Sequence, residues 1–327
     1  MERGHLARKS GQDARAPTST PLILVNLLFN MTITQHIENL FGLEAKIYFK
    51  HKQTGGNANQ KGSRYEDFFS VMQLAQLFRL LIQADDDQDI EIYAQAEAFV
   101  DDLLIVYRNH NSQHHFQLKT TPTVAWGEGL KSISDDFCKQ KMLNDQLGIS
   151  KTHTFLVCAN KKKAEILKQN RPIMIADFTD VVFFPEAETI NQLLLTHSEF
   201  KALISCICLS DDSDKLEALA KLIFGHWGDK KTTLFSVKAL LSSLQNTFPN
   251  YLAKTDVTAA LLPEAERILA NIVHFSYNIE RGYFSWHYGH ADSGTLPYPV
   301  DHKEFLAFQH KIISERPKQF DELEGIL

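Results

Sequence analysis

Two short strand-like runs, separated by a polar break, constrain the fold of this chain more than any other feature of its sequence. Residues 101–107 are branched and aliphatic, residues 108–112 are polar, and residues 113–121 indicate a returning strand. A break this short favours an antiparallel hairpin whose turn is centred on His110 and Asn111. The turn then determines which side chains of the two strands lie opposite each other.

The register of this hairpin brings an acidic residue close to a lysine. With the turn at His110, Asp102 lies opposite Lys119 and Leu104 lies opposite Gln117, with paired Cβ atoms about 5 Å apart. A slip of one residue would put Asp101 in the place of Asp102. An ordinary cross-strand salt bridge would give the same pattern, so the hairpin by itself does not establish a catalytic site.

The groups that this hairpin assembles suit the cleavage of phosphodiesters. Because side chains alternate along a strand, Gln117 and Lys119 share a face, and Leu118 offers only its backbone carbonyl. A carboxylate and a carbonyl are hard oxygen ligands for Mg²⁺, and Mn²⁺ accepts the same donors. A lysine beside the metal either acts as a base or holds a phosphate as a cation, and both roles stay open.

Four short motifs follow one another along residues 60–160. They are Gly62-Ser63-Arg64-Tyr65-Glu66 opening an apolar helix, then Glu97-x-x-x-Asp101-Asp102, then Gln117-Leu118-Lys119-Thr120, then a link to another helix that contains Trp126. In this order they resemble the PD-(D/E)XK nuclease superfamily, and most of all its Mrr-like branch, which carries Gln-x-Lys in place of Glu-x-Lys. Within that branch they are similar to the double-stranded DNA nuclease domain of bacterial anti-phage effectors.

The resemblance implies a Mg²⁺-dependent endonuclease that cuts double-stranded DNA in the cytoplasm as part of defence against phage. It assigns the catalytic roles to Asp102 as the principal metal ligand, Gln117 at the Glu/Gln position, Lys119 as the catalytic lysine and Glu66 as the helix carboxylate near the metal. Asp101 is the rival of Asp102, and the Leu118 carbonyl completes the set of ligands. Because Gln117 is neutral, it either contributes its amide oxygen or leaves the metal one negative charge short. Glu97 also falls where relatives carry an acid.

Glu66 has a second interpretation that the sequence leaves open. Residues 63–66 form a capping box, in which Ser63 accepts a hydrogen bond from the Glu66 amide and the Glu66 side chain returns one. The next residue, Asp67, is expected to be solvated or to face the helix dipole.

Residues 45–65 are locally basic and contain no acid. Placed just before the first motif, they predict a flexible arm that touches DNA phosphates through Lys50, Lys52, Lys61 and Arg64. A solvated loop without a nucleic-acid role is the alternative. The formal net charge of −6 does not exclude DNA binding, because the position of the charges decides it.

Composition narrows the class of protein. With 327 residues, of which 44% are hydrophobic and 23% charged, the chain is long enough for two globular domains. No apolar run reaches the roughly 18–20 residues of a membrane span, so no membrane partner is expected. The four cysteines show no zinc-ligand spacing, which favours a reducing cytoplasm.

The pattern predicts an α/β fold: a restriction-endonuclease-like core with a mixed sheet flanked by helices, followed by a mostly helical domain. Residues 1–30 are assigned to a disordered tail or a mis-annotated start before Met31, residues 31–175 to the nuclease domain, and residues 176–327 to the helical domain. The expected elements are helices at 33–42, 64–83, 130–147, 187–208, 213–227 and 232–247, strands at 89–95 and 152–159 and within 170–185, and an aromatic hairpin at 274–288.

Other functions stay open at this point. The helical half would sense an activating ligand, dock a partner protein or form a homo-oligomer. The chief alternative is a catalytically silent nuclease-fold scaffold in a multi-subunit defence or repair complex, which the neutral Gln117 favours. A nuclease for RNA or single strands and an unrelated ligand sensor are the remaining alternatives.

Overall fold

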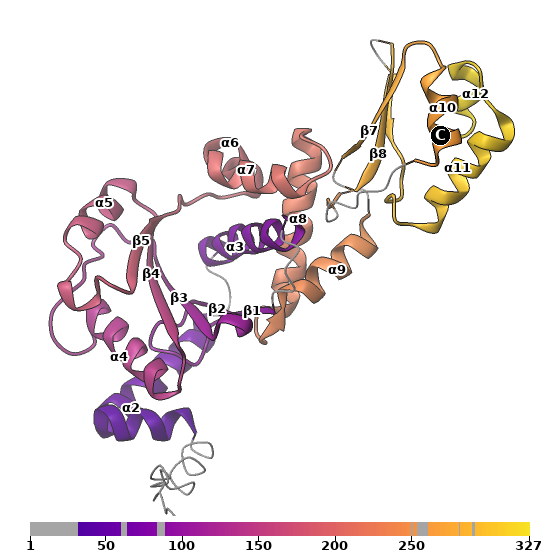
Figure 1. Cartoon of the computed structure of the whole chain (residues 1–327). Coiled ribbons are helices and arrows are strands. Elements are labelled where there is room, and N and C mark those ends of the chain that lie inside the picture. The colour runs from indigo at the N-terminus through magenta and orange to yellow at the C-terminus, as the bar shows by residue number, and fades with distance from the viewer. Residues whose placement is uncertain are drawn as a thin grey trace, which may run out of the picture. The chain divides into compact units, whose positions relative to one another are not determined.

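The computed structural model describes residues 32–59, 64–83, 89–249, 251–253, 261–280, 282–289 and 292–327 (Figure 1). Residues 1–30 and Lys61, for which the sequence makes predictions, lie outside the described residues. The chain divides into two compact units, residues 1–47 and 48–327. Helix α2 (Ile33–Asn59) begins in the first unit and continues in the second, and its helical geometry is interrupted at Gly42 (φ 82°, ψ 177°), a conformation open to glycine.

A mixed six-stranded sheet forms the centre of the second unit, in the order β5-β4-β3-β2-β1-β6. The strands are β1 (Ile90–Ala94), β2 (Leu103–Tyr107), β3 (Ser112–Lys119), β4 (Lys151–Cys158), β5 (Thr179–Phe183) and β6 (Phe235–Ser236). The first three are antiparallel neighbours, whereas β4 and β5 run parallel to β3. The predicted α/β class with a mixed sheet flanked by helices is therefore confirmed, including the additional strand within residues 170–185.

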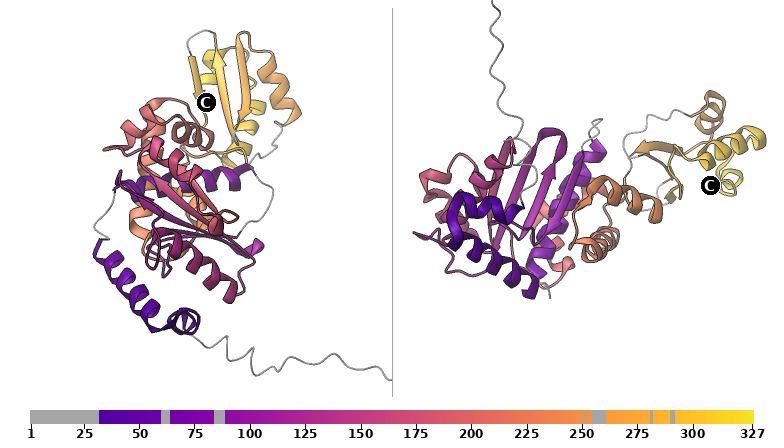
Figure 2. Two further views of the ribbon diagram at one scale, coloured as in Figure 1. Left: turned by 90° about the vertical axis from the view of Figure 1, so that its left-hand side faces the viewer. Right: turned by 90° about the horizontal axis from the view of Figure 1, so that it is seen from below.

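The two faces of the sheet bury different helices (Figure 2). Leu156 of β4 belongs to a hydrophobic cluster with Phe137 of α4 (Ile133–Gln146) and Leu167 of α5 (Lys161–Gln169). Val157, the next residue, belongs to the larger cluster on the other face. A strand whose successive side chains are buried on opposite faces needs apolar residues at consecutive positions, which explains the apolar run at 155–159.

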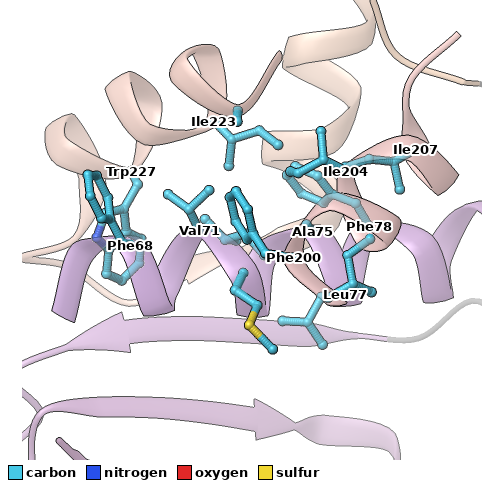
Figure 3. Close-up of a cluster of buried hydrophobic side chains, with 14 of the residues drawn as sticks. Phe68, Val71, Ala75, Leu77, Phe78, Phe200, Ile204, Ile207, Ile223 and Trp227 are labelled. Carbon is cyan, nitrogen blue, oxygen red and sulfur yellow. The ribbon is translucent and has the colours of Figure 1, made fainter. Parts of the chain in front are cut away.

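Helix α3 (Arg64–Gln83) is covered on both sides, which is why its sequence is apolar on most faces. Toward the sheet, the Phe69 ring lies 5.4 Å from the Phe116 ring, centroid to centroid. Away from the sheet, Phe68 meets Phe224, and α3 packs against α7 (Ser198–Ile207), α8 (Ser213–Lys230) and α9 (Val237–Thr247) (Figure 3). A short helix, α6 (Ile190–Thr196), precedes α7.

The boundary expected between residues 175 and 176 falls inside this continuous core. The cluster that contains α3 runs from Tyr65 to Ala253, and a separate cluster runs from Leu261 to Ile326. The physical reason is that the outer face of α3 needs an apolar cover, and residues 190–247 supply it. The C-terminal part is also less helical than expected, because it contains a second sheet of three strands.

That second sheet pairs β7 (Phe275–Glu280), β8 (Tyr283–Tyr288) and β9 (Asp292–Thr295), and α10 (Pro263–Ala270), α11 (Lys303–Glu315) and α12 (Phe320–Glu324) accompany it. The aromatic hairpin at 274–288 is thus confirmed. Its aromatic rings pack against the helices of this part of the chain. The ring centroids of Phe284 and Phe308 lie 5.4 Å apart, and the Tyr288 ring stacks on the Phe320 ring with centroids 4.0 Å apart. These aromatic side chains form a hydrophobic core. Packing therefore accounts for the many aromatic residues of the hairpin, and stacking on nucleic-acid bases is not needed to explain them.

One glycine of this sheet is required by an aromatic neighbour. Gly294 of β9 lies opposite Trp286, and a Cβ atom added to it would lie 2.7 Å from Cζ2 of the Trp286 ring. We expect Gly294→Ala to lower the free energy of unfolding by about 1–3 kcal/mol, because the ring has to move. Urea denaturation measures this, with Gly225→Ala in α8 as the control, since its added Cβ meets nothing within 4 Å. Equal stability of Gly294→Ala and the wild type would contradict the prediction.

In the part of the chain that the structure describes, no helix combines the length and apolar character needed to cross a membrane.

Candidate active site

The turn of the β2–β3 hairpin lies earlier than expected, and this changes the register. Leu103 pairs with Phe116 and Leu104 with His115, so Leu104 does not lie opposite Gln117 as predicted. The connection is residues 108–111, which end in a left-handed Asn111 (φ 45°), so the pairing is displaced by two residues. Because the displacement is even, every side chain keeps its expected face.

The corrected register brings Asp102 level with Gln117 instead of Lys119. The Asp102 carboxylate accepts a hydrogen bond from Gln117 Nε2, and Asp102 Oδ2 lies 2.6 Å from the backbone nitrogen of Leu118, which also donates to it. Since the N–H and C=O of one strand residue project from the same edge, the Leu118 carbonyl faces this edge too. The three motif residues Asp102, Gln117 and Leu118 are therefore in direct contact or adjacent.

Glu66 joins the same place from the first turn of α3. Its Oε2 accepts a hydrogen bond from Gln95 Nε2 at 3.2 Å. The pKa of Glu66 is raised to about 7, mainly by burial and in addition by the charges of Asp102 and Asp67, while Lys119 and the hydrogen bond from Gln95 oppose the rise. Glu66, Asp102 and Lys119 thus interact electrostatically across three elements. Ser63, the other half of the expected capping box, lies outside the described residues.

Asp101 faces a different partner from Asp102. It is 7% exposed, and its Oδ1 lies 3.5 Å from Lys52 Nζ without a hydrogen bond. Burial raises the pKa of Asp101 to about 6, Lys52 lowers it and the charge of Asp102 raises it. The two adjacent carboxylates are therefore divided between a lysine on one side and the β3 amides on the other.

The basic residues assigned to DNA binding lie in different environments. Lys52 is not part of a flexible arm: α2 continues as a helix to Asn59, and the Lys52 side chain is only 18% exposed. Its ammonium contacts Asp101 and Asp136, so two carboxylates lie where a DNA phosphate was predicted. Lys50 is exposed on the same helix. Burial opposes the charged form of Lys52, but the carboxylates outweigh burial and raise the pKa of Lys52.

Arg64, the fourth predicted DNA contact, lines a cavity at the end of β3. It is exposed, and its Nη1 donates to the Glu188 carbonyl at 2.8 Å. The cavity measures about 610 Å³, and its lining includes Thr120, the residue after Lys119. The remaining lining residues are Tyr65, Glu186, Ala187, Glu188 and Gln192. An open, polar space therefore adjoins the motif residues.

Two further residues were missed or misread from the sequence. Asp136 in the first turn of α4 accepts hydrogen bonds from Tyr48 and Lys52, and only the spacing of four residues between Tyr48 and Lys52 hinted at a shared face. Asp67 lies in the first turn of α3, as the helix-dipole alternative expects, but it is not solvated, because it pairs with Lys231 and accepts a hydrogen bond from Trp227. Glu97 is exposed.

The site holds more carboxylates than ammonium groups. The carboxylates are those of Glu66, Asp101, Asp102 and Asp136, and the ammonium groups are those of Lys52 and Lys119. This surplus contributes to the raised pKa values of Glu66 and Asp101, and a divalent cation would relieve it. Two carboxylates and a strand carbonyl are also the donors that Mg²⁺ prefers, since it keeps several waters. The donor types therefore fit Mg²⁺, although among the described residues no three or more His, Cys, Asp or Glu side chains are grouped closely enough to hold a metal ion.

The buried side chain of His115, in β3, contacts Val100 in the loop that contains Asp101. Its lowered pKa predicts that the stability of the protein depends on pH. His115 Nδ1 lies 3.2 Å from the Val100 carbonyl, and Nε2 lies 3.1 Å from Asn144 Nδ2. Burial lowers the pKa of His115 to about 4, so the unfolded chain binds this proton first as the pH falls below about 6.5. We expect the His115 contribution to cost about 2 kcal/mol of unfolding free energy between pH 7 and pH 5.

Urea unfolding at several pH values measures this contribution as the difference between the wild type and His115→Asn. The difference is needed because Glu66, whose pKa is raised, changes stability in the opposite direction over the same range. Parallel pH profiles of the two proteins would refute the assignment to His115.

Comparisons with protein-family models, with curated proteins and with solved structures found no match for this chain. What the site can do is therefore inferred from its own geometry.

Proposed function

We propose that this protein is a metal-dependent endonuclease that hydrolyses phosphodiester bonds of double-stranded DNA. The observation that supports this most is that Asp102 contacts the Leu118 edge of the sheet, while Glu66 lies close enough to Asp102 and Lys119 for their charges to shift its pKa. A loop, a helix and a strand thus bring carboxylates, a carbonyl and an ammonium into one neighbourhood, next to the cavity that Thr120 lines. Such a group has the donors and the charge that phosphodiester hydrolysis uses.

The roles of the residues follow from their contacts. Asp102, Glu66 and the Leu118 carbonyl would hold Mg²⁺ or Mn²⁺, which when bound would neutralise charge on the phosphate and activate water. Gln117 holds Asp102 in place through its amide. Lys119 either binds the scissile phosphate or accepts the proton of the attacking water. Asp101 faces Lys52, which favours Asp102 as the main ligand.

The substrate would lie across the end of the sheet where β3 and β4 finish. Lys119 pairs with Cys158 there, and Lys161 and Lys162 follow, exposed, at the start of α5. Together with Arg64 at the start of α3, they would contact phosphates without reading sequence. A cytoplasmic role in defence against phage, with residues 261–327 sensing a ligand, a partner protein or a second copy of the chain, completes this proposal and rests on the motif resemblance.

A substrate panel tests the proposal. The purified protein is incubated with supercoiled plasmid, linear duplex, single-stranded DNA and RNA, each with Mg²⁺, Mn²⁺ or EDTA. We expect cleavage of the two duplexes with metal and a loss of roughly 10²-fold or more in Asp102→Asn. Cleavage that persists in EDTA, or equal rates for Asp102→Asn and the wild type, would refute a metal site at Asp102.

One observation favours the silent scaffold as a second candidate. Asp102 Oδ2 already accepts hydrogen bonds from Gln117 and Leu118, so these donors satisfy the oxygen without a metal. A scaffold would bind duplex DNA equally well with and without Mg²⁺ and would cleave none of the substrates in the panel.

A further inference from the structure

Lys52, which lies in α2 and belongs to none of the four motifs, extends its side chain to the site. Lys52 Nζ has three protons to donate, and four oxygen atoms surround it, namely three hydrogen-bond acceptors and Asp101 Oδ1 at 3.5 Å. It donates to the Phe99 carbonyl, to Asp136 Oδ2 at 3.1 Å and to Gln117 Oε1 at 3.5 Å. Every donor of this ammonium is therefore used inside the protein, and the side chain is 18% exposed.

Helices α2 and α4 hold this lysine in position. Tyr48, one turn before Lys52, donates to the same Asp136 oxygen at 3.0 Å. Asp136 lies in the first turn of α4, where a helix favours negative charge. Lys52 is consequently attached at its backbone to α2 and at its ammonium to α4, to the loop before β2 and to β3.

The Gln117 carboxamide connects this lysine to Asp102. An amide has an acceptor end and a donor end, so an oxygen that faces an ammonium turns the NH₂ group the other way. Gln117 Oε1 faces Lys52, and Nε2 donates to Asp102 Oδ2. The contacts therefore form a chain in which Lys52 orients Gln117 and Gln117 orients Asp102.

We propose that Lys52 is a positioning residue of the site, which holds Gln117 as a hydrogen-bond donor to Asp102 and thereby keeps the Gln117 oxygen from serving as a metal ligand. An ammonium and a metal ion are both positive and would compete for the same amide oxygen. This role explains why position 117 carries a neutral amide. The amide can accept from the Lys52 ammonium and donate to the Asp102 carboxylate, whereas a carboxylate at this position would be repelled by Asp102. The metal part of this inference rests on the proposed function, whereas the orientation of Gln117 does not.

The orientation of Gln117 is tested without any metal. In ¹H–¹⁵N spectra of the metal-free protein, the side-chain NH₂ signal of Gln117 is assigned by its loss in Gln117→Leu. We expect a proton resonance shifted downfield by the Asp102 carboxylate, which moves back in Lys52→Met and stays in place in Lys141→Met. Lys141 is the matched control, because its ion pair with Asp145 lies at the surface of α4. An unchanged Gln117 signal in Lys52→Met would overturn the proposal.

The effect on the metal is tested by a double-mutant cycle. Mn²⁺ is titrated into the wild type, Lys52→Met, Gln117→Leu and the double variant, and free Mn²⁺ is read from its EPR signal. Because Lys52 acts through Gln117, we expect Lys52→Met to weaken binding by roughly tenfold in the wild type but less than about twofold in Gln117→Leu. The same factor in both backgrounds, or tighter binding once the positive charge is gone, would show that Lys52 acts by charge alone and overturn the proposal.

Two provisions keep the outcomes separable. Lys52→Met leaves both Asp136 and Asp101 without this cation, so Lys52→Met with Asp136→Asn serves as a second variant in both experiments, because it removes the shorter of the two ion pairs as a unit. If the wild type binds no Mn²⁺, the proposed function fails, and the Gln117 spectrum still decides whether Lys52 positions the amide.

Discussion

Replacing Lys119 by alanine is expected to slow cleavage of duplex DNA by roughly 10²–10³-fold. The charge of Lys119, at the end of β3, acts on the Glu66 carboxyl group, as the charge of Asp102 does. Among the described residues, no carboxylate oxygen lies within 4.0 Å of the Lys119 ammonium. It is therefore free to meet a phosphate or a water. Its loss removes a positive charge where negative charge develops in the transition state.

The measurement is the initial rate of plasmid nicking at saturating Mg²⁺, accompanied by duplex affinity and thermal unfolding. Lys151→Ala is the matched control, because Lys151 is exposed at the opposite end of the neighbouring strand β4 and should leave the rate unchanged. Lys119→Arg then separates the two roles, since an arginine retains phosphate binding but does not act as a base. A Lys119→Ala rate within threefold of the wild type would rule out a catalytic role for this lysine.

Replacing Asp67 by alanine is expected to lower the free energy of unfolding by about 3–5 kcal/mol. Asp67 lies in the first turn of α3, 14% exposed, 2.8 Å from Lys231 Nζ and 2.9 Å from Trp227 Nε1. Its removal leaves an ammonium and an indole N–H without their acceptor inside the protein. The expected effect is large because these contacts join α3 to the end of α8, across the position where two domains were predicted.

Urea unfolding followed by tryptophan fluorescence measures this loss. The double variant Asp67→Leu with Lys231→Met removes both charges and should recover most of the stability. Glu264→Ala, which breaks the exposed pair with Arg316, is the control and should cost less than about 1 kcal/mol. If Asp67→Ala and Glu264→Ala were equally mild, the buried pair would not stabilise the junction of α3 and α8.

The local part of this structure could be predicted because local chemistry decides it. The unbroken apolar run at 155–159 required burial on both faces of β4, the apolar surface of α3 required a helix inside the protein, and the aromatic run at 274–288 formed a hairpin. The order of the motifs likewise placed Asp102, Gln117 and Leu118 in one region, because neighbouring strands of a hairpin meet whatever their exact register.

What only the tertiary structure decided were contacts between residues far apart in the chain. Lys52 was expected in a loop on DNA, yet α2 carries it to Asp101, Asp136 and Gln117, and no pattern within residues 45–65 reports those partners. Asp67 likewise meets residues more than 150 positions later. The physical reason is that periodicity and propensity act over a few residues, whereas the burial of a charge depends on which distant element covers it and brings the opposite charge.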